Sequence, residues 1–282
     1  MRLKTLFSLF VILAMATLYA AAAPISVVVV VDESGSMAGE HAWLPTMISS
    51  LDSKLATLGI TATYGLYGFG SSGAGQSGRE LLDGGTAAQF AAAAAGLVIS
   101  GSVEDGYAGL NFAFTNFSFP ADAARNYILV TDEDRDDTNS ALTYANILSS
   151  LLAQKALLNV VVNNPYTCSA GAALGVDSNS NGYTADGFGG FTSCANPVVG
   201  NGAGFTETTY VPMALATGGA AWNLNLLRAG GATAQSFTAA FVDIKVQEIQ
   251  EQTEIPEPAT LLLCGTALLG LGILRRRSAK RA

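Results

Sequence analysis

The sequence predicts an α/β fold: a doubly wound, mostly parallel six-stranded sheet with helices on both faces. Strand-like and helix-like patterns alternate along the chain. Three segments are almost wholly apolar, namely 25–31 ("ISVVVVV"), 126–132 ("NYILVTD") and 157–164 ("LLNVVVNN"). Strands with no polar alternation are buried on both faces, so these three are expected at the centre of the sheet.

The spacing of apolar residues and the turn residues between segments predict the other elements. Helices are expected over 44–58, 87–99, 105–117, 138–156, 207–217 and 232–252, and further strands over 60–69, 79–82 and 220–227. The short strand 79–82 suits an antiparallel edge. No internal repeat is present, so residues 24–252 are interpreted as one domain.

Both ends of the chain look like processing segments. Residues 1–23 place two basic residues before an apolar run that ends in small residues, which is typical of a secretory signal peptide. A buried N-terminal helix is the alternative.

The C-terminal tail, residues 255–282, has three parts in order. Pro256, Glu257 and Pro258 precede an uncharged, apolar stretch at 259–274, and basic residues follow at 275–281. This tail resembles the PEP-CTERM sorting signal of Gram-negative bacteria. The resemblance implies secretion, transient anchoring in the inner membrane by a transmembrane helix, cleavage by an exosortase, and delivery to the cell envelope, cell surface or extracellular matrix, often alongside exopolysaccharide. A plain C-terminal anchor is the alternative.

Without these ends the body is strongly acidic. Of 14 basic and 22 acidic residues, two basic residues lie in the signal, and five basic and one acidic residue lie in the tail. The body therefore carries a net charge near −14. Nucleic acid is excluded as a partner, because phosphate binding needs a basic surface.

Cysteine usage agrees with export. Cys264 lies in the tail, which leaves Cys168 and Cys194 in the body as candidates for one disulfide in an oxidising compartment. Two free thiols are the alternative. The spacing matches no zinc motif.

Oxygen-bearing side chains follow two of the apolar strands. Asp32 ends the first strand, Ser34 and Ser36 come two and four residues later, and Asp132 ends "LVTD". Ligands bind parallel sheets at the carboxyl ends of the strands, so these groups are expected to converge there. Hard oxygen ligands suit Mg²⁺. A polar turn that caps the next helix is the alternative.

These residues resemble the von Willebrand factor A (vWA) domain and its metal-ion-dependent adhesion site (MIDAS). The resemblance spans about residues 25–250 and rests on "DESGS", "LVTD" and "MALATGGAAWNL". It implies a Rossmann-like vWA fold and a metal, Mg²⁺ or else Mn²⁺ or Ca²⁺, held by Asp32, Ser34, Ser36 and Asp132. The second metal loop departs from the family pattern and offers Ser102 or Glu104, with Glu104 slightly favoured by its position before a helix.

A long Gly/Asn/Ser-rich insert covers about 165–205. Its "DSNSNG" places Asp177, Asn179 and Asn181 as in the opening of a calcium loop, but the twelfth position lacks Glu. A weak calcium site and a solvated turn are both open. The insert leaves the same sheet edge as Asp132, so we expect the loop between its two cysteines to roof the cation.

The function expected from these features is binding. The open coordination position of the metal would take an acidic group of a protein or polysaccharide partner. The alternative is a structural component of the matrix or envelope in which the metal only stabilises the loops. An enzyme is not expected, because His41 is the only histidine and no nucleophile motif accompanies it.

Overall fold

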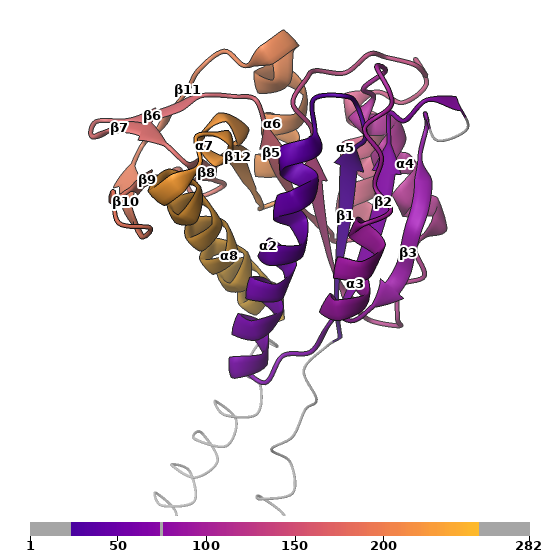
Figure 1. Ribbon diagram of the computed structural model, residues 1–282, viewed down its shortest axis with the longest axis horizontal. Helices are drawn as coiled ribbons and strands as arrows, with labels where there is room; N and C mark the ends of the chain where they lie inside the picture. The colour runs from indigo at the N-terminus through magenta and orange to yellow at the C-terminus, as the bar shows by residue number, and fades with distance from the viewer. Residues whose placement is uncertain (1–23, 74–75, 254–282) are drawn as a thin grey trace, which may run out of the picture. The chain divides into compact units, whose positions relative to one another are not determined.

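Strand β1 (Ile25–Asp32) lies inside the sheet, and all of its residues are buried. In the computed structural model, which describes residues 24–73 and 76–253, β1 pairs in parallel with β2 (Ala62–Phe69) and β4 (Ala124–Val130) (Figure 1). The predicted signal peptide and sorting tail, with its apolar helix, lie outside the described residues. Within the described ranges, no helix is both long enough and apolar enough to cross a membrane.

The main sheet has nine strands in the order β10-β9-β8-β12-β5-β4-β1-β2-β3. The run from β3 (Arg79–Gly85) through β5 (Leu157–Val162) to β12 (Ala220–Asn223) has the strand order 3-2-1-4-5-6 of doubly wound folds. Only β3 is antiparallel within this run, as expected for an edge strand. The predicted α/β class, with a mostly parallel sheet between helices, is confirmed.

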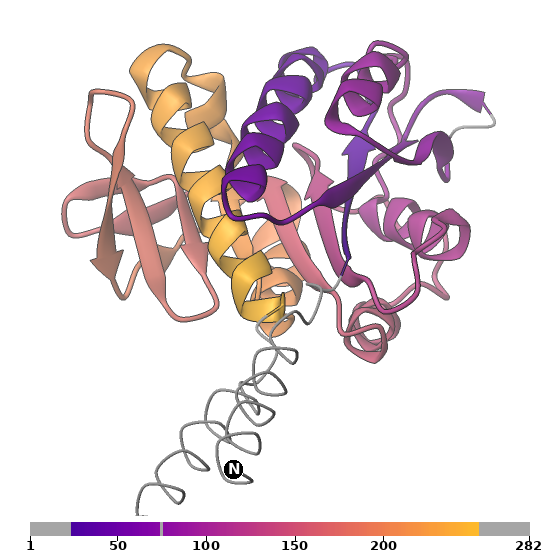
Figure 2. The same cartoon turned by 90° about the horizontal axis from the view of Figure 1, so that it is seen from below.

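The sheet is wider than the six strands expected, because the insert adds three more. Strands β8 (Gly175–Asp177), β9 (Asn181–Ala185) and β10 (Phe191–Ala195) are antiparallel, and β8 pairs with β12. A separate small sheet contains β6 (Tyr166–Cys168), β7 (Gly171–Ala173) and β11 (Val198–Val199). The disulfide Cys168–Cys194 ties the two sheets together. Figure 2 shows the insert beyond one edge of the helix-flanked sheet.

The expectation that the disulfide-closed loop roofs the cation is wrong. Strands β12, β5 and β4 separate β8 from β1, which at about 4.8 Å per strand is roughly 19 Å. The physical reason is the free edge of β12, whose backbone groups need hydrogen-bond partners and find them in β8.

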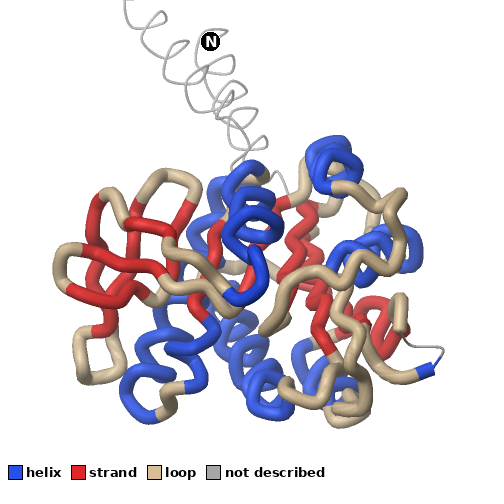
Figure 3. The backbone as a smooth tube through the Cα atoms, turned by 90° about the horizontal axis from the view of Figure 1, so that it is seen from above, coloured by secondary structure: helices blue, strands red, loops and turns tan. Residues whose placement is uncertain are grey.

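Helices cover both faces of the sheet (Figure 3). One face carries α2 (Ala38–Thr57), α3 (Ala87–Ala94) and α8 (Gly231–Thr253), and the other carries α4 (Gly106–Asn116), α5 (Tyr144–Ala153) and α6 (Thr206–Ala216). The valines of β1 alternate between two cores: Val27, Val29 and Val31 join the first, and Val28 and Val30 the second. This double burial explains why the strand has no polar alternation.

The strand expected over 220–227 ends early. Asn223 closes β12, and its side chain accepts a hydrogen bond from the backbone N–H of Asn225 (3.1 Å). This cap begins the short helix α7 (Leu224–Arg228). The result places Arg228 at the carboxyl end of the sheet, beside the loops that follow β1 and β4.

We expect the disulfide to stabilise the insert. Replacing both Cys168 and Cys194 with Ser should lower the free energy of unfolding by about 3 kcal/mol, because the unfolded chain loses a 26-residue constraint. Denaturant unfolding followed by circular dichroism measures the change. The matched control is Cys264→Ser, which removes the cysteine of the tail and should leave the midpoint unchanged. An unchanged midpoint for the double variant would contradict the expectation.

Candidate metal centre

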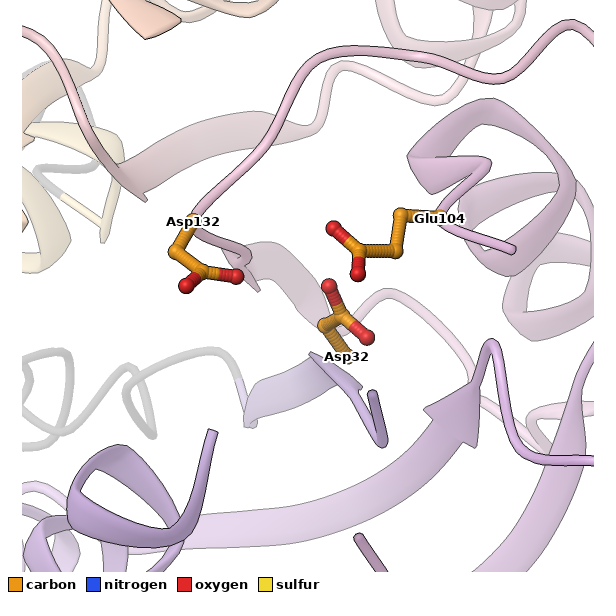
Figure 4. A group of neighbouring side chains, drawn as sticks. All are labelled: Asp32, Glu104 and Asp132. Atoms are coloured by element: carbon orange, nitrogen blue, oxygen red, sulfur yellow. The ribbon is translucent and has the colours of Figure 1, made fainter. Parts of the chain in front are cut away.

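Three acidic residues from separate segments converge at the carboxyl edge of the sheet. Asp32 is the last residue of β1, Asp132 lies two residues beyond β4, and Glu104 lies two residues before α4. One carboxylate oxygen from each lies within 4.8 Å of the others. Figure 4 shows the carboxylates of Asp32 and Glu104 directed toward each other, with Asp132 beside them. The expected convergence of Asp32 and Asp132 is therefore present.

Hydroxyl groups complete this cluster. The turn after β1 is closed by the backbone N–H of Ser34, which donates to Asp32 Oδ1 (2.7 Å). The hydroxyls of Ser34 and Ser36 lie 3.2 Å apart, and Ser36 donates to Asp132 Oδ1 (3.0 Å). Thr131 donates to Asp32 Oδ2 (2.9 Å), a contact that the sequence did not single out. Five of the six predicted ligands thus lie together.

The sixth, Ser102, is not part of the cluster. Its side chain is exposed, whereas Glu104 is only 7% exposed and belongs to the acidic triad. A bridge between Ser34 and Gly101 holds this second loop against the first. The geometry therefore favours Glu104 over Ser102 as the candidate ligand of the second loop.

Burial makes the cluster electrostatically unfavourable without a cation. Burial raises the pKa of Asp32 to about 6, against hydrogen bonds from Ser34 and Thr131 that lower it. The pKa of Glu104 rises to about 8, first through burial and then through repulsion from Asp32. Glu104 Oε2 is buried and has no hydrogen-bond partner among the described residues.

A divalent cation fits this donor set. Carboxylate and hydroxyl oxygens are the ligands that Mg²⁺, Mn²⁺ and Ca²⁺ prefer, and Glu104 has a buried Oε2 with no partner among the described residues.

Arg228 is a site residue that the sequence reasoning missed. Its Nη2 donates to Asp132 Oδ2 (2.9 Å), and its Nε donates to Glu40 Oε1 (2.6 Å). The side chain is 33% exposed, and its Nη1 has no partner among the described residues. The available signal was position: α7 begins where β12 ends, at the same edge as the metal loops.

Two neighbouring acids support the loops instead of joining the triad. Glu33 is fully buried, and it accepts hydrogen bonds from Arg79 Nε (2.7 Å) and the backbone N–H of Val98 (2.9 Å). Burial opposes ionisation of Asp105, but Arg135 and Thr138 hold its pKa below the usual value. The pKa of Asp105, which has an arginine partner, is therefore lowered, whereas that of Glu104 is raised by burial and by repulsion from Asp32.

The candidate calcium residues form the turn between β8 and β9. Asp177 Oδ1 accepts the backbone N–H groups of Asn179 (2.9 Å) and Asn181 (2.8 Å). Its Oδ2 accepts the side chains of Asn181 (2.9 Å) and Tyr183 (2.7 Å). A cation at Asp177 would have to displace these donors, so the geometry favours the solvated turn.

Comparison with known protein families identifies a motif in the C-terminal tail. A family model for the PEP-CTERM protein-sorting motif matches residues 254–277. The chain carries a PEP-CTERM sorting motif. Such motifs mark exported proteins that an exosortase processes at the membrane and that are sorted to the cell surface. No curated protein matches the chain by sequence.

Solved structures that resemble this chain are remote in sequence. They include an aerotolerance-related membrane protein from Bacteroides fragilis NCTC 9343 (16% identity, 80% of this chain and 99% of that chain, TM-score 0.47). A von Willebrand factor type A structure from Catenulispora acidiphila has 20% identity over 50% and 33% of the two chains, with a TM-score of 0.35. The vWF domain of the type V pili tip protein Mfa5 from Porphyromonas gingivalis has 19% identity over 43% of this chain and 44% of that chain, with a TM-score of 0.34. The chain thus spans less than half the length of the latter two.

The raised pKa values predict that the cation-free protein becomes less stable as pH rises. The folded-state pKa values of Asp32 (about 6) and Glu104 (about 8) exceed the ordinary 3.8 and 4.5, so the folded state binds more protons between those limits. Stability is therefore lost as pH rises toward 8. When EDTA removes divalent cations, we expect the melting temperature of the protein to fall by about 5 °C between pH 5 and pH 8.

Calorimetry in EDTA measures this fall, and added Mg²⁺ should restore more stability at pH 8 than at pH 5. Glu104→Gln serves as the matched variant, since it removes the group with the higher pKa and should flatten the profile. A pH-independent melting temperature in the unsubstituted protein would contradict the assigned electrostatics.

Proposed function

We propose that this protein is a surface-sorted binding module in which a divalent cation, held by Asp32, Ser34, Ser36, Glu104 and Asp132, captures an acidic group of a partner. The observation that carries the proposal is the buried triad itself, in which one carboxylate oxygen from each residue lies within 4.8 Å of the others and Glu104 has a buried Oε2 without a partner among the described residues. The cation, when bound, supplies a Lewis-acidic position for a carboxylate from an acidic protein or polysaccharide.

Arg228 supports a ligand of this charge. Three ionised carboxylates exceed the charge of a divalent cation by one, and the guanidinium at Asp132 supplies one positive charge at the rim. Its unpartnered Nη1 is available for a charge-assisted hydrogen bond to an incoming carboxylate. We therefore assign Arg228 a role in holding Asp132 and in contacting the ligand.

Binding, not catalysis, is the proposed activity. His41 uses Nε2 in a 2.7 Å hydrogen bond with the backbone oxygen of Asp32, which ties it to the loop. Within the described residues, the triad is accompanied by no cysteine or second histidine that could act as a nucleophile or base. The Ser34 and Ser36 hydroxyls contact each other and Asp132, as expected for ligands or turn residues.

The sorting motif supports a location of this proposed activity at the cell surface. We propose export to the envelope, surface or extracellular matrix of a Gram-negative bacterium, with transient inner-membrane anchoring through the tail until exosortase acts. A second candidate is a structural matrix or envelope component. Exposed apolar side chains of the insert favour it, namely Phe188 (93% exposed) and Val198 (64%), since they suit contact with a polymer.

Removal of the cation separates the two candidates. We expect the full chain, purified in mild detergent, to bind surfaces coated with polygalacturonate or polyglutamate in Mg²⁺ and to lose that binding in EDTA. Asp32→Ala should reduce Mg²⁺ affinity at least about 100-fold, because a ligand is lost while the helices and sheet remain. Isothermal titration calorimetry measures the Mg²⁺ affinity, and circular dichroism measures whether the helices and sheet remain. Equal binding with and without cation would favour the structural role.

The second-loop ligand can be tested by a pair of substitutions. Glu104→Gln keeps the size of the side chain but removes its charge, so Mg²⁺ affinity should fall at least tenfold. Ser102→Ala should leave affinity within twofold, because the Ser102 side chain is exposed outside the triad. Titration calorimetry of both variants measures the two Mg²⁺ affinities. A larger loss of affinity in Ser102→Ala than in Glu104→Gln would identify Ser102 as the ligand of the second loop.

A further inference from the structure

A polar groove lies beside the metal loops. It has a volume of about 530 Å³, within the range of about 300–1,000 Å³ typical of small-molecule sites. Its walls come from α4, from the loop between β2 and β3, and from the loop between β4 and α5. The walls include the polar residues Gln76, Asn111, Thr138 and Asn139 and the apolar residues Phe112 and Leu142.

The groove differs in charge from the rest of the body. Its walls contain amides, hydroxyls and apolar groups but no Asp, Glu, Lys or Arg, whereas the protein as a whole has a formal net charge of −8. An uncharged groove on an acidic protein does not select its ligand by charge. It also gives no support to phosphate, a basic peptide or a metal as occupant.

Side-chain amides in the walls are free to bind. No hydrogen bond joins the side chains of Gln76 or Asn111 to any other described residue. Asn139 uses its Oδ1 to accept the backbone N–H of Ala141 (3.1 Å), and its Nδ2 has no partner within the described ranges. Each amide offers donors and acceptors side by side, which matches vicinal hydroxyls of a sugar.

An aromatic ring supplies the apolar part of the groove. Phe112 is partly exposed, and its ring packs edge-on against Tyr67 with the centroids 6.0 Å apart. A Cβ at Gly78 would meet the Phe112 ring at 2.5 Å, so the backbone at this glycine closes over one side of the ring. The Phe112 ring, which Tyr67 and Gly78 fix in place, and Leu142 form the apolar surface of the groove. Such a surface is suited to the C–H face of a sugar.

We propose that this groove binds an uncharged stretch of a polysaccharide. A sugar chain needs closely spaced hydroxyl-to-amide contacts and one apolar platform, and the groove provides both. An extended peptide would instead use a free strand edge or a deep apolar pocket. The groove wall near the β2–β3 loop begins with Gln76 and Ser77, which lie outside both strands.

The groove adjoins the metal loops through two hydrogen bonds from Thr138, one from its backbone N–H and one from its hydroxyl. The hydroxyl donates to Asp105 Oδ2 (2.7 Å), and Asp105 directly follows Glu104. A polysaccharide with both acidic and neutral units could therefore contact the metal site and the groove together. This last step rests on the proposed metal-dependent function, whereas sugar binding in the groove does not require the cation.

The test is performed on the full chain in mild detergent with EDTA, so that the metal site contributes nothing. The probes are neutral oligosaccharides of about six units: a β-1,4-glucan, an α-1,4-glucan, a β-1,4-galactan and an α-1,6-mannan. Saturation-transfer NMR and titration measure binding. We expect at least one probe to bind, and the double variant Gln76→Leu/Asn111→Leu to weaken it at least tenfold.

Gln247→Leu is the matched control, because Gln247 is an exposed amide on α8 outside the groove. It should leave sugar binding unchanged. Absence of binding by all four probes, or equal weakening by the control, would overturn the proposal. Binding of an uncharged Gly-Ser-Asn peptide in place of the sugars would overturn it in favour of a peptide ligand.

The metal hypothesis is tested separately by polygalacturonate in Mg²⁺. Loss of that binding in Asp32→Ala, with neutral-sugar binding retained, supports both proposals. If polygalacturonate binding is the same with and without Mg²⁺, while the groove variant still binds the neutral oligosaccharide more weakly, only the metal-dependent function is contradicted.

Discussion

Confinement of three carboxylates at the end of β1 is the constraint on which the site depends. Repulsion and burial act together on Asp32 and Glu104, and the pKa values rise to about 6 and about 8. Hydrogen bonds from Ser34 and Thr131 to Asp32, and the ion pair from Arg228 to Asp132, offset only part of this cost. Glu104 has a side-chain hydrogen bond with Ser34, but its Oε2 has no partner among the described residues. The arrangement is understandable if the missing positive charge is supplied by a bound ion.

The surrounding residues show that the missing charge is specific to the triad. Glu33 and Asp105 are equally buried, yet each has an arginine, Arg79 or Arg135. These pairs connect the loop after β1 to β3 and the start of α4 to the loop after β4. A body with so few basic residues thus places three of its arginines around one rim. The pairs make the loops rigid and leave a single uncompensated position between them.

Local patterns predicted the fold and most of the site because both are tied to strand ends. A wholly apolar strand must be central, and residues after parallel strands must share an edge, which located Asp32 and Asp132. Arg228 was missed although its position near the end of a predicted strand was a signal, because its contact with Asp132 depends on the short helix α7 that the cap at Asn223 begins. The insert was misplaced for another reason: its weak Gly/Asn-rich pattern does not say which free edge it will pair with. The groove joins three separate segments, so no single sequence window contains it.

Placement of the insert at the far edge has a consequence for access to the rim. Because β8 pairs with β12, the insert strands extend the sheet sideways and leave three strands between themselves and β1. The loops before α4 and after β4 then form one side of the rim, and α4 together with the loop after β4 also contributes walls to the polar groove. A ligand at Glu104 therefore has a neighbouring surface on α4, whereas strands β8, β9 and β10 of the insert lie beyond β12. On this geometry the selectivity of the site is expected from α4 and Arg228, and the disulfide-closed insert contributes stability and a separate surface.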